Sequence, residues 1–452
     1  MLRSLRYLAG AGLLTAALAA PALAAGDAPQ APAPAPSKTT EDDAGQQVRQ
    51  LRRQIEELER RLDVLAGELE RRELGETAVR ADSGEHGYGP AASKVYRTNQ
   101  GLSVGGYGEV LYQGFDSTRD DGSAAGERDT LDLERAVVYL GYKLSDDWLF
   151  NSEIEYEHGA VGEEHEGEVG VEFAYLDYLW KPQLSFRAGL VLVPMGFLNE
   201  LHEPTVFLGA RRPDVEDRII PTTWRENGFG LFGEAGPFSY RTYVINGFDG
   251  SRFEAEGLHE GKQDGSQAAA EDFAWVGRLD YHPVPGALVG ASAYVGDSGQ
   301  GLEDPRGRRI GLRTTLYEGH AEWRWRGLEL RALGVRADLS DVARLDRTLG
   351  LVGEESVGSR LSGGYLQAGY DLLASRSTGR QLIPYARWET LDTQAAVPDG
   401  YSRGPANRVR SLTLGIAFKP IDQVIFKADY QDYRNDAGTG LDQVNVGMGY
   451  IF

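Results

Sequence analysis

The 452-residue chain has no cysteine, only three methionines and only seven histidines. Without cysteine, disulfide bonds, thiolate catalysis and cysteine-ligated metal sites are excluded. The histidines show no HExxH spacing, and only His158 and His165 lie close together, in an acidic segment. A phosphate-binding loop, a hydrolase motif and a basic tract for nucleic acid are also missing. The sequence therefore predicts a protein that is not an enzyme, needs no metal or cofactor, and does not bind nucleic acid.

Long apolar runs are missing as well. No segment approaches the roughly 20 consecutive apolar residues that a membrane-spanning helix needs, and the mean hydropathy is -0.39. Strands of a membrane β-barrel carry their apolar residues in alternation, so a barrel is compatible with this low hydropathy. The alternative at this point is a glycine-rich soluble β-protein, since the chain contains 58 glycines.

The first residues have the pattern of a secretory signal peptide. Arg3 and Arg6 supply positive charge, Leu8–Leu18 form a short apolar run, and Ala22–Ala24 supply the small residues at which signal peptidase cleaves. We expect residues 1–25 to be removed on export.

Three segments precede the part of the chain that is rich in strands. Residues 26–45 contain several prolines and read as an extended linker. Residues 46–72 carry apolar side chains at alternating spacings of three and four, which predicts a short coiled-coil helix. Residues 73–100, rich in Gly and Ser, read as a flexible connection. The coiled-coil positions are Val48, Leu51, Ile55, Leu58, Leu62, Leu65 and Leu69.

The heptad pattern leaves two questions open. A single amphipathic helix that lies on another surface would show the same apolar stripe. The number of helices is also undetermined, because Val and Ile at position a with Leu at d favour two helices, whereas Leu62 and Leu69 do not.

Residues 101–452 read as sixteen strands, from Leu102–Tyr112 to Leu441–Phe452. An even number of strands and short turns that alternate with generally longer loops are typical of a bacterial outer-membrane barrel. The prediction is an all-β fold, a sixteen-stranded antiparallel transmembrane β-barrel wide enough for an aqueous channel.

Alternation within the strands predicts which side chains face the lumen. Side chains of a strand point alternately to its two faces. In residues 148–157, Trp148 and Phe150 lie on one face, and Glu153 and Glu155 lie on the other. Charges on the lipid face would cost several kcal/mol, so the charged face must point inward. The pore-lining and selectivity candidates predicted in this way are Arg135, Lys143, Arg187, Arg278, Arg331, Arg387, Lys427, Glu153 and Glu155.

The longest connection, Pro194–Asn227, mixes apolar and charged residues. A long loop with this composition is not expected to extend into solvent. We expect it to fold into the lumen and narrow the pore; packing over the barrel mouth or against a neighbouring subunit is the alternative. Its candidate constriction residues are Arg211, Arg212, Arg218, Arg225, Glu200 and Glu203.

The chain ends in an alternating strand that closes on the aromatic Phe452. This terminus resembles the last strand of outer-membrane barrel proteins, whose final aromatic residue is read by the barrel-assembly machinery. We expect Phe452 to serve assembly and its strand to pair with Leu102–Tyr112.

One segment also resembles a known family. The run that contains Phe186, Gly189, Pro194, Gly196, Glu203, Arg211, Pro221, Arg225 and Gly228–Gly230 is similar to the phosphate-selective porin O and P family. The resemblance implies a homotrimeric outer-membrane porin with an inward-folded third loop. It also favours three helices in the coiled coil.

Charge bears on selectivity. The expected lumen cations and carboxylates nearly balance, and the whole chain carries a net charge of -21, which argues against strict phosphate selectivity. Part of the acidity lies in the expected outer loops at residues 116–129 and 163–168. Ordinary solvated loop charge is the favoured explanation, and the alternative is that these carboxylates meet divalent cations that bridge lipopolysaccharide.

The sequence thus predicts an outer-membrane porin that forms a water-filled channel for small hydrophilic solutes, including anions such as phosphate. Its expected partners are outer-membrane lipid, lipopolysaccharide and the assembly machinery, with the coiled coil in the periplasm. The alternative is a barrel that serves mainly as an envelope tether or carries an unrecognised hydrolase activity.

Overall fold

A computed structural model describes residues 84–162, 165–376 and 379–452. The chain divides into two compact units, Met1–Leu74 and Gly75–Phe452, and every described residue belongs to the second unit. The predicted signal peptide (1–25), linker (26–45) and coiled coil (46–72) therefore lie outside the described residues.

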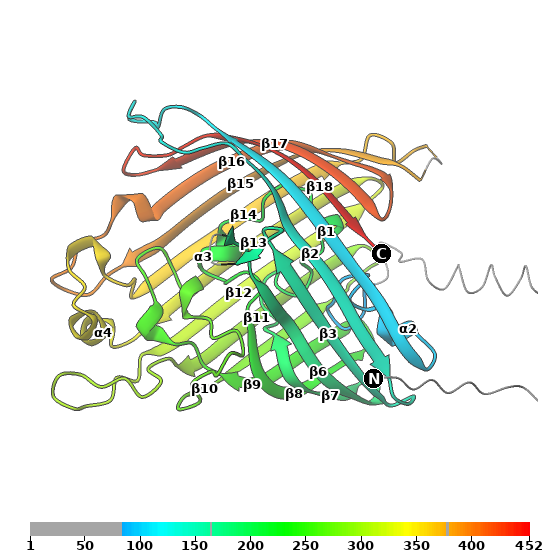
Figure 1. The fold of residues 1–452 in the computed structure, drawn as a ribbon, viewed down its shortest axis with the longest axis horizontal. Helices are drawn as coiled ribbons and strands as arrows, with labels where there is room; N and C mark the ends of the chain where they lie inside the picture. Colours follow the sequence, from blue (N-terminus) through cyan, green and yellow to red (C-terminus); the bar gives the residue numbers. More distant parts are fainter. Residues whose placement is uncertain (1–83, 163–164, 377–378) are drawn as a thin grey trace, which may run out of the picture. The chain divides into compact units, whose positions relative to one another are not determined.

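Sixteen antiparallel strands form one closed barrel, which confirms the predicted fold class and strand number (Figure 1). Each strand pairs with its neighbours along the chain, and the last strand closes on the first. The barrel strands are β1 (Gly101–Phe115), β2 (Thr130–Lys143), β3 (Trp148–Glu157), β6 (Val169–Lys181), β7 (Leu184–Leu192), β8 (Arg225–Ala235), β9 (Phe238–Asn246), β10 (Phe273–Tyr281), β11 (Ala287–Asp297), β12 (Arg313–Trp325), β13 (Leu328–Leu339), β14 (Arg360–Tyr370), β15 (Gln381–Ala396), β16 (Arg408–Ile421), β17 (Val424–Asn435) and β18 (Gln443–Ile451).

The remaining elements are short. The α-helices are α2 (Lys94–Arg97), α3 (Val215–Arg218) and α4 (Val342–Leu349), and β4 (Val161–Gly162) and β5 (His165–Glu166) form a small separate sheet. Short 3-10 helices are η1 (Pro204–Val206), η2 (Gly250–Arg252), η3 (His259–Gly261), η4 (Gly353–Glu355) and η5 (Pro405–Asn407). Among the described residues, none of the helices has the length and apolarity that crossing a membrane requires.

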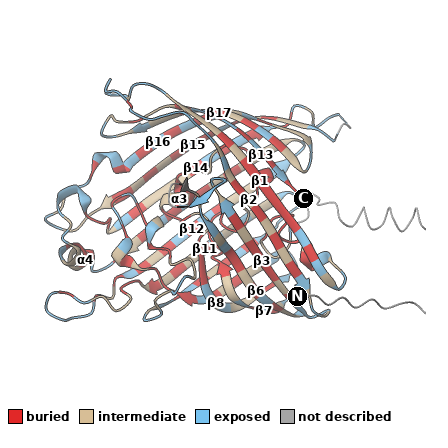
Figure 2. Cartoon of the chain, viewed as in Figure 1, coloured by how far each residue is buried: buried red, intermediate tan, exposed pale blue. Residues whose placement is uncertain are grey.

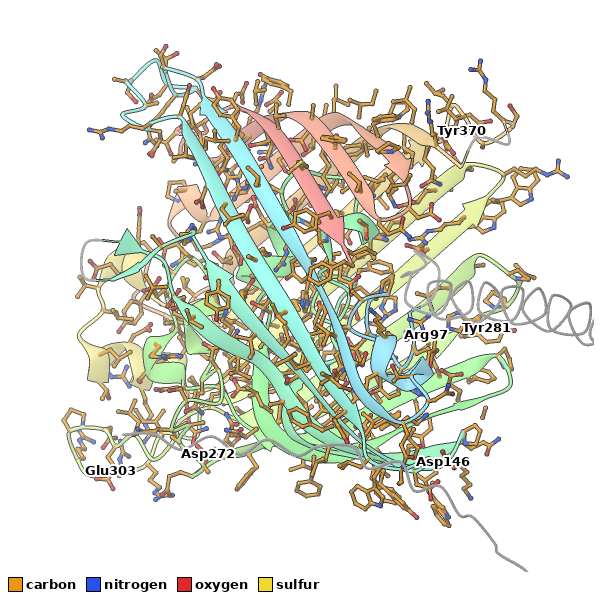
Figure 3. The ribbon with its side chains drawn as sticks, turned by 45° about the vertical axis from the view of Figure 1, so that its right-hand side comes forward. Arg97, Asp146, Asp272, Tyr281, Glu303 and Tyr370 are labelled. Atoms are coloured by element: carbon orange, nitrogen blue, oxygen red, sulfur yellow. The ribbon has the colours of Figure 1, made fainter. Side chains whose placement is uncertain are left out.

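The two ends of the barrel differ in the length of their connections. Figure 3 shows Asp146, in the turn between β2 and β3, and Tyr281, at the end of β10, toward one end. Asp272 and Glu303, in the loops before β10 and after β11, lie toward the other end. We call these the short-turn end and the long-loop end. This arrangement agrees with the predicted alternation of short turns and longer loops.

Burial alternates along the strands as the sequence pattern predicts (Figure 2). On β3, Trp148 and Tyr156 are exposed on the outer wall, whereas Asn151, Glu153 and Glu155 are buried inside. Lipid provides no hydrogen-bond partners, so apolar side chains belong on the outer wall and charged side chains inside.

The C-terminal residue closes the barrel at the seam between β1 and β18. Tyr107 pairs with Ile451, and Phe452 exchanges two backbone hydrogen bonds with Gly106, of 2.9 and 3.1 Å. The Phe452 ring lies over Gly106, where an added Cβ would approach the ring to 2.6 Å. The predicted pairing of the last strand with Leu102–Tyr112 is confirmed.

A variant that ends at Ile451 is expected to give less folded barrel in the membrane fraction. It loses both backbone hydrogen bonds with Gly106, worth about 0.5–1.5 kcal/mol each, together with the ring contact. The folded fraction is measured by the heat-dependent shift of the barrel band in gel electrophoresis. Phe452→Tyr keeps the backbone bonds and the ring, so it is the matched control and should fold normally. A full yield of the truncated chain would contradict the assembly role.

Candidate functional site

The connection between β7 and β8, residues 193–224, crosses the inside of the barrel. Figure 1 shows its helix α3 surrounded by strands. The Ala210 N–H donates to Asp429 on β17 at 2.7 Å, and the Val215 N–H donates to Glu389 on β15 at 2.6 Å. Lys419 on β16 donates to the Thr205 carbonyl at 2.7 Å. We call residues 193–224 the inner loop; it runs from β7 and β8 to the wall formed by β15–β17.

Glu216 ties the inner loop together. Its carboxylate accepts backbone N–H bonds from Phe197 and Leu198 at 2.6 and 2.7 Å, and the Tyr365 hydroxyl of β14 donates to it at 2.6 Å. Burial raises the pKa of Glu216 above its ordinary value. The Glu216 side chain therefore connects the start of the inner loop and its helical part to the barrel wall.

Apolar side chains attach the same loop to the wall. Leu208 forms a buried cluster with wall residues of β15–β17, and Val215 and Ile219 are fully buried. These side chains explain why a loop rich in apolar residues folds inward, since only the lumen wall removes them from water. The wall residues of the Leu208 cluster are Ile383, Tyr385, Ala417 and Ile425.

A second connection, residues 247–272 between β9 and β10, also packs inward. Phe248 stacks on Trp224 of the inner loop with ring centroids 4.3 Å apart, and Tyr294 of β11 lies 5.1 Å from Trp224. Farther along this connection, the Ala255 carbonyl accepts a 2.6 Å bond from Thr393 on β15. This second loop therefore also occupies part of the lumen. The sequence pattern did not predict its inward packing.

Residues 84–97 fill part of the lumen at the short-turn end, and we call them the plug. Ala91, Ala92 and Val95 are buried, and Asn151 on β3 donates to the Ala92 carbonyl at 3.0 Å. The predicted flexible connection over 73–100 thus differs from the structure in this part, because residues 84–97 are packed against the wall. The residues before 84 lie outside the described range.

Arg187 of β7 holds the plug. Its guanidinium forms a two-pronged ion pair with Asp177 of β6 at 2.8 and 2.9 Å and donates to the hydroxyls of Tyr88 and Tyr96 at 2.8 and 2.7 Å. The guanidinium also lies 4.0 Å from the ring centroid of Tyr175. Both charged side chains are 0% exposed, so Arg187, predicted to line the pore, is instead enclosed by the plug.

Glu203 joins the plug to the inner loop. Its carboxylate accepts the backbone N–H groups of Ala91 and Ala92, both at 2.9 Å. Burial raises the pKa of Glu203 to about 7. The neighbouring His202 lies 3.1 Å from both carboxylate oxygens of Glu153 on β3. Plug, inner loop and barrel wall thus meet at one buried polar cluster.

A cavity of about 450 Å³ lies between the plug, the inner loop and the wall of β8–β13. Exposed residues such as Glu234 and His282, near the short-turn end, are part of its lining. We call this cavity the vestibule. Its charged lining residues include Arg241, Arg278, Arg324, Arg331, Glu200, Asp280 and Glu322.

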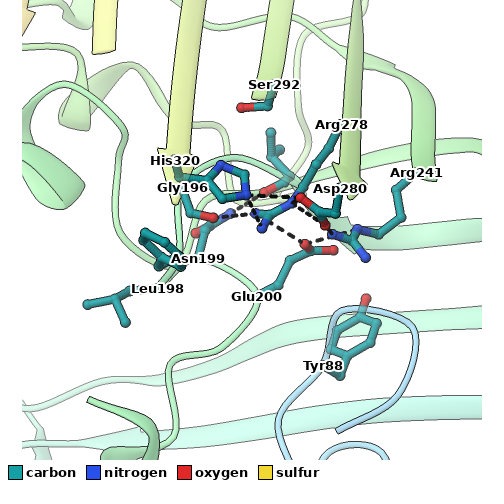
Figure 4. A network of polar contacts seen from close by, with 12 residues as sticks. Tyr88, Gly196, Leu198, Asn199, Glu200, Arg241, Arg278, Asp280, Ser292 and His320 are labelled. Atoms are coloured by element: carbon teal, nitrogen blue, oxygen red, sulfur yellow. Dashed lines mark hydrogen bonds and ion pairs between the residues drawn. The ribbon is translucent and has the colours of Figure 1, made fainter. Parts of the chain in front are cut away.

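Figure 4 shows how charges in the vestibule neutralise one another. Arg241 lies 3.1 Å from Glu200 and 2.8 Å from Asp280, and Arg278 lies 2.9 Å from Asp280. Arg278 also donates to the Gly196 carbonyl at the start of the inner loop. His320 lies between Asp280 and Glu318 at 2.9 and 2.8 Å. The network fixes the inner loop to β9–β12 and leaves little unbalanced charge.

The other predicted wall cations are also close to carboxylates. The pairs are Arg135–Glu155 (3.4 Å), Arg331–Glu322 (2.6 Å), Arg387–Glu389 (4.0 Å) and Lys427–Glu109 (3.8 Å). Lys143 lies 3.5 Å from the Tyr96 carbonyl of the plug. Nearly every predicted lumen cation therefore has a carboxylate partner, as the near-neutral charge balance of the sequence suggested.

The predicted constriction residues have separate roles. Arg225, at the start of β8, pairs with Glu172 at 2.7 Å, and Arg218 donates to the Glu256 carbonyl of the second inward loop at 3.0 Å. The carbonyl of Arg211 accepts from Arg387, and Arg212 donates to Thr222. Arg225 therefore joins two wall strands, β6 and β8, and Arg212 makes its contact within the inner loop. The contacts of Arg211 and Arg218 hold the inner loop in place, and Glu200 and Glu203 connect it to the wall and the plug.

Large aromatic side chains at inward-facing strand positions are a sequence signal for a filled lumen that the predictions above did not use. Phe173, Tyr175, Tyr243 and Tyr294 point inward and are at most 1% exposed. In a water-filled lumen these aromatic rings would remain exposed to water. Their inward-facing positions therefore indicate that another segment of the chain covers them. No group of His, Asp or Glu suited to hold a metal ion occurs among the described residues.

The chain has a relative in Aquifex aeolicus (strain VF5), an uncharacterized protein. The two sequences are 38% identical over 360 residues, which cover 77% of this chain and 80% of that protein. The two proteins belong to one family. No family model matches the chain, so the resemblance to the phosphate-selective porin O and P family remains a prediction.

Solved structures with the same fold include OmpF of Salmonella typhi, determined in complex with daunomycin. It matches with a TM-score of 0.50 and 13% identity over 78% of this chain and 98% of that chain. The anion-selective porin from Comamonas acidovorans matches with a TM-score of 0.46 and 14% identity over 78% of this chain and all of that one. At such low identity, the OmpF match shows the barrel fold alone.

Proposed function

We propose that this protein is a non-enzymatic outer-membrane porin that admits small hydrophilic solutes through a narrow, largely charge-balanced path. The observation that carries the proposal is the closed sixteen-stranded barrel with an apolar outer wall, a charged interior and a loop folded inside it. A barrel of this size encloses enough space for an aqueous path even when loops narrow it.

The vestibule is the proposed entrance at the short-turn end. Its arginines are paired with carboxylates, so the field that would concentrate a single sign of charge is weak. We therefore propose a path for small neutral and charged solutes. Phosphate is included, without the exclusive selectivity that the family resemblance implies.

The remaining expectations from the sequence form part of the proposal. They are a homotrimer in the outer membrane, contact with outer-membrane lipid and lipopolysaccharide, insertion by the barrel-assembly machinery, and a periplasmic coiled coil over residues 46–72.

Conductance in planar bilayers tests the channel. The purified full-length protein is expected to give small ohmic steps, in groups of three if the barrels insert as trimers. Reversal potentials in a salt gradient are expected to stay close to zero, because the lumen charges are paired. If neither the full-length protein nor a variant without residues 84–97 conducts, the porin function is refuted.

The plug favours a second candidate, a structural tether. Residues 84–97 are packed inside the barrel, so any domain at the N-terminal side is held by a buried anchor. A tether would predict weakened attachment of the barrel to the cell envelope when residues 46–72 are deleted, with unchanged conductance. The two candidate functions are thus separated by measuring both properties on the same variant.

A further inference from the structure

The outer wall formed by β11–β16 carries two adjoining recesses. The first, of about 600 Å³, is lined mainly by small and apolar residues, together with Glu322, Arg331 and Gln367. The second, of about 610 Å³, reaches the strand ends near the long loops. Leu366 on β14 and Trp388 on β15 form part of both recesses and face each other across the two strands. The recesses are therefore neighbours along the outer wall.

Alanines give the first recess its depth. Ala368 and Ala386 are opposite each other in the β14–β15 pair, next to Leu366 and Trp388. Larger side chains, which are 40–59% exposed, border them on the lipid side. The alanines in the lining are Ala287, Ala321, Ala332, Ala368 and Ala386, and the larger outward side chains are Val289, Trp323, Leu366, Trp388 and Leu412.

Arginines border the second recess. Arg403 and Arg408 line it, with side chains 46% and 54% exposed. Arg336 and Arg410 lie opposite the lining residues Ser362 and Thr390 in their strand pairs. Arg360 lies two positions before Ser362, and all three arginines are about half exposed. Such exposed guanidinium groups at the edge of an apolar wall lie where lipid headgroups are found.

The arginines around the second recess share their aspartate partners. Arg336 and Arg360 share Asp338 at 2.6 and 3.0 Å, and Arg408 and Arg410 share Asp436 at 3.4 and 2.7 Å. Arg403 pairs with Asp392. In these ion pairs five arginines share three aspartates, so Asp338 and Asp436 each serve two guanidinium groups. Exposed ion pairs are weak, so these guanidinium groups can exchange partners at little cost.

We propose that the two recesses bind one phosphate-bearing anionic lipid of the surrounding leaflet. Its phosphate would lie against Arg403 and Arg408, because guanidinium groups bind phosphate oxygens with two parallel hydrogen bonds. Its acyl chains would follow the wall past Leu366 and Trp388 into the alanine-lined recess. Exposed arginines beside an apolar recess match the phosphate and the acyl chains of such a lipid. The inference rests on the membrane location in the proposed function.

Lipid retention by the full-length protein tests this proposal. Detergent-solubilised protein is mixed with phosphatidylglycerol or phosphatidylcholine of identical acyl chains, and bound lipid is counted by native mass spectrometry. We expect one phosphatidylglycerol to be retained in preference to phosphatidylcholine. The double variant Arg403→Ala/Arg408→Ala should bind it roughly tenfold more weakly or worse, as expected for two arginines near a lipid phosphate. Ala368→Phe, which fills the apolar recess, should also lower retention.

Arg309→Ala/Arg313→Ala is the matched control, since both arginines are exposed and ion-paired near the long loops but do not line the recesses. Equal loss in this control, equal binding of both lipids, or full competition by inorganic phosphate would overturn the proposal. A change in oligomer size caused by Ala368→Phe, with unchanged lipid retention, would also overturn it in favour of contact with a second copy of the chain. Conductance of all variants should stay normal, so a failure of this inference is distinguishable from a failure of the porin function.

Discussion

Arg187→Met is expected to release the plug and to raise single-channel conductance several-fold. The substitution leaves Asp177 buried without its cation and removes the guanidinium that donates to Tyr88 and Tyr96, so that Tyr96 keeps only its own 2.6 Å bond to Asp177 and its contact with Tyr175. Removing one partner of a buried ion pair costs about 3–5 kcal/mol. The plug depends on this contact more than the barrel does, because the barrel is held by sixteen hydrogen-bonded strand pairs. Conductance in planar bilayers and cleavage of the plug by trypsin measure the release.

Arg313→Met provides the control for this experiment. Arg313 forms a 3.2 Å ion pair with Asp297, but its side chain is 57% exposed, and exposed pairs contribute about 0–1 kcal/mol. This variant should match the unchanged protein in both measurements. A heat-dependent gel shift establishes that the Arg187 variant still forms a barrel. Normal conductance and a protected plug in a folded Arg187→Met barrel would show that Arg187 does not hold the plug.

Deletion of Thr205–Asp217 should give the largest increase in conductance and admit larger solutes. The deletion removes the part of the inner loop that bonds to Asp429 and Glu389 on the far wall. It also removes Glu216, the buried acceptor of three hydrogen bonds. Emptying this part of the lumen widens the path, because the sixteen strands fix the diameter of the barrel. Single-channel recordings and liposome swelling with sugars of increasing size measure the effect.

Deletion of Asp120–Ser123 is the control, since these residues form the exposed tip of the loop between β1 and β2. Their removal should change neither conductance nor the size limit for solutes. If the inner-loop deletion folds into a barrel and conducts like the unchanged protein, the inner loop does not form the constriction.

Much of the barrel could be predicted from the sequence because its signals are local. The parity of Trp148 and Glu153 sets which face of β3 meets lipid, and a shift by one residue would bury charge in hydrocarbon. The pairing of the terminal strand with β1 followed from counting an even number of strands. The free-energy cost of a charge in hydrocarbon acts at each residue, so the inward and outward positions of a strand can be predicted without knowing which segments are in contact.

The contents of the lumen could not be predicted in the same way. Residues 84–97 look like a linker because glycine and serine carry no periodic signal, yet Tyr88 and Tyr96 meet Arg187 about ninety to a hundred positions away. Likewise, the sequence places Arg187 on the inward face but does not show that Asp177 and the plug enclose it.

By itself, then, the sequence determined the barrel, its sixteen strands, the inward face of each strand and the inward tendency of the inner loop, because lipid enforces alternation residue by residue. Only the tertiary structure decided what fills the lumen, which charges neutralise one another and where the vestibule lies. These outcomes depend on contacts between residues far apart in the chain, such as Glu203 with Ala91 and Ala210 with Asp429. Such contacts become favourable only after the closed wall has brought their partners together.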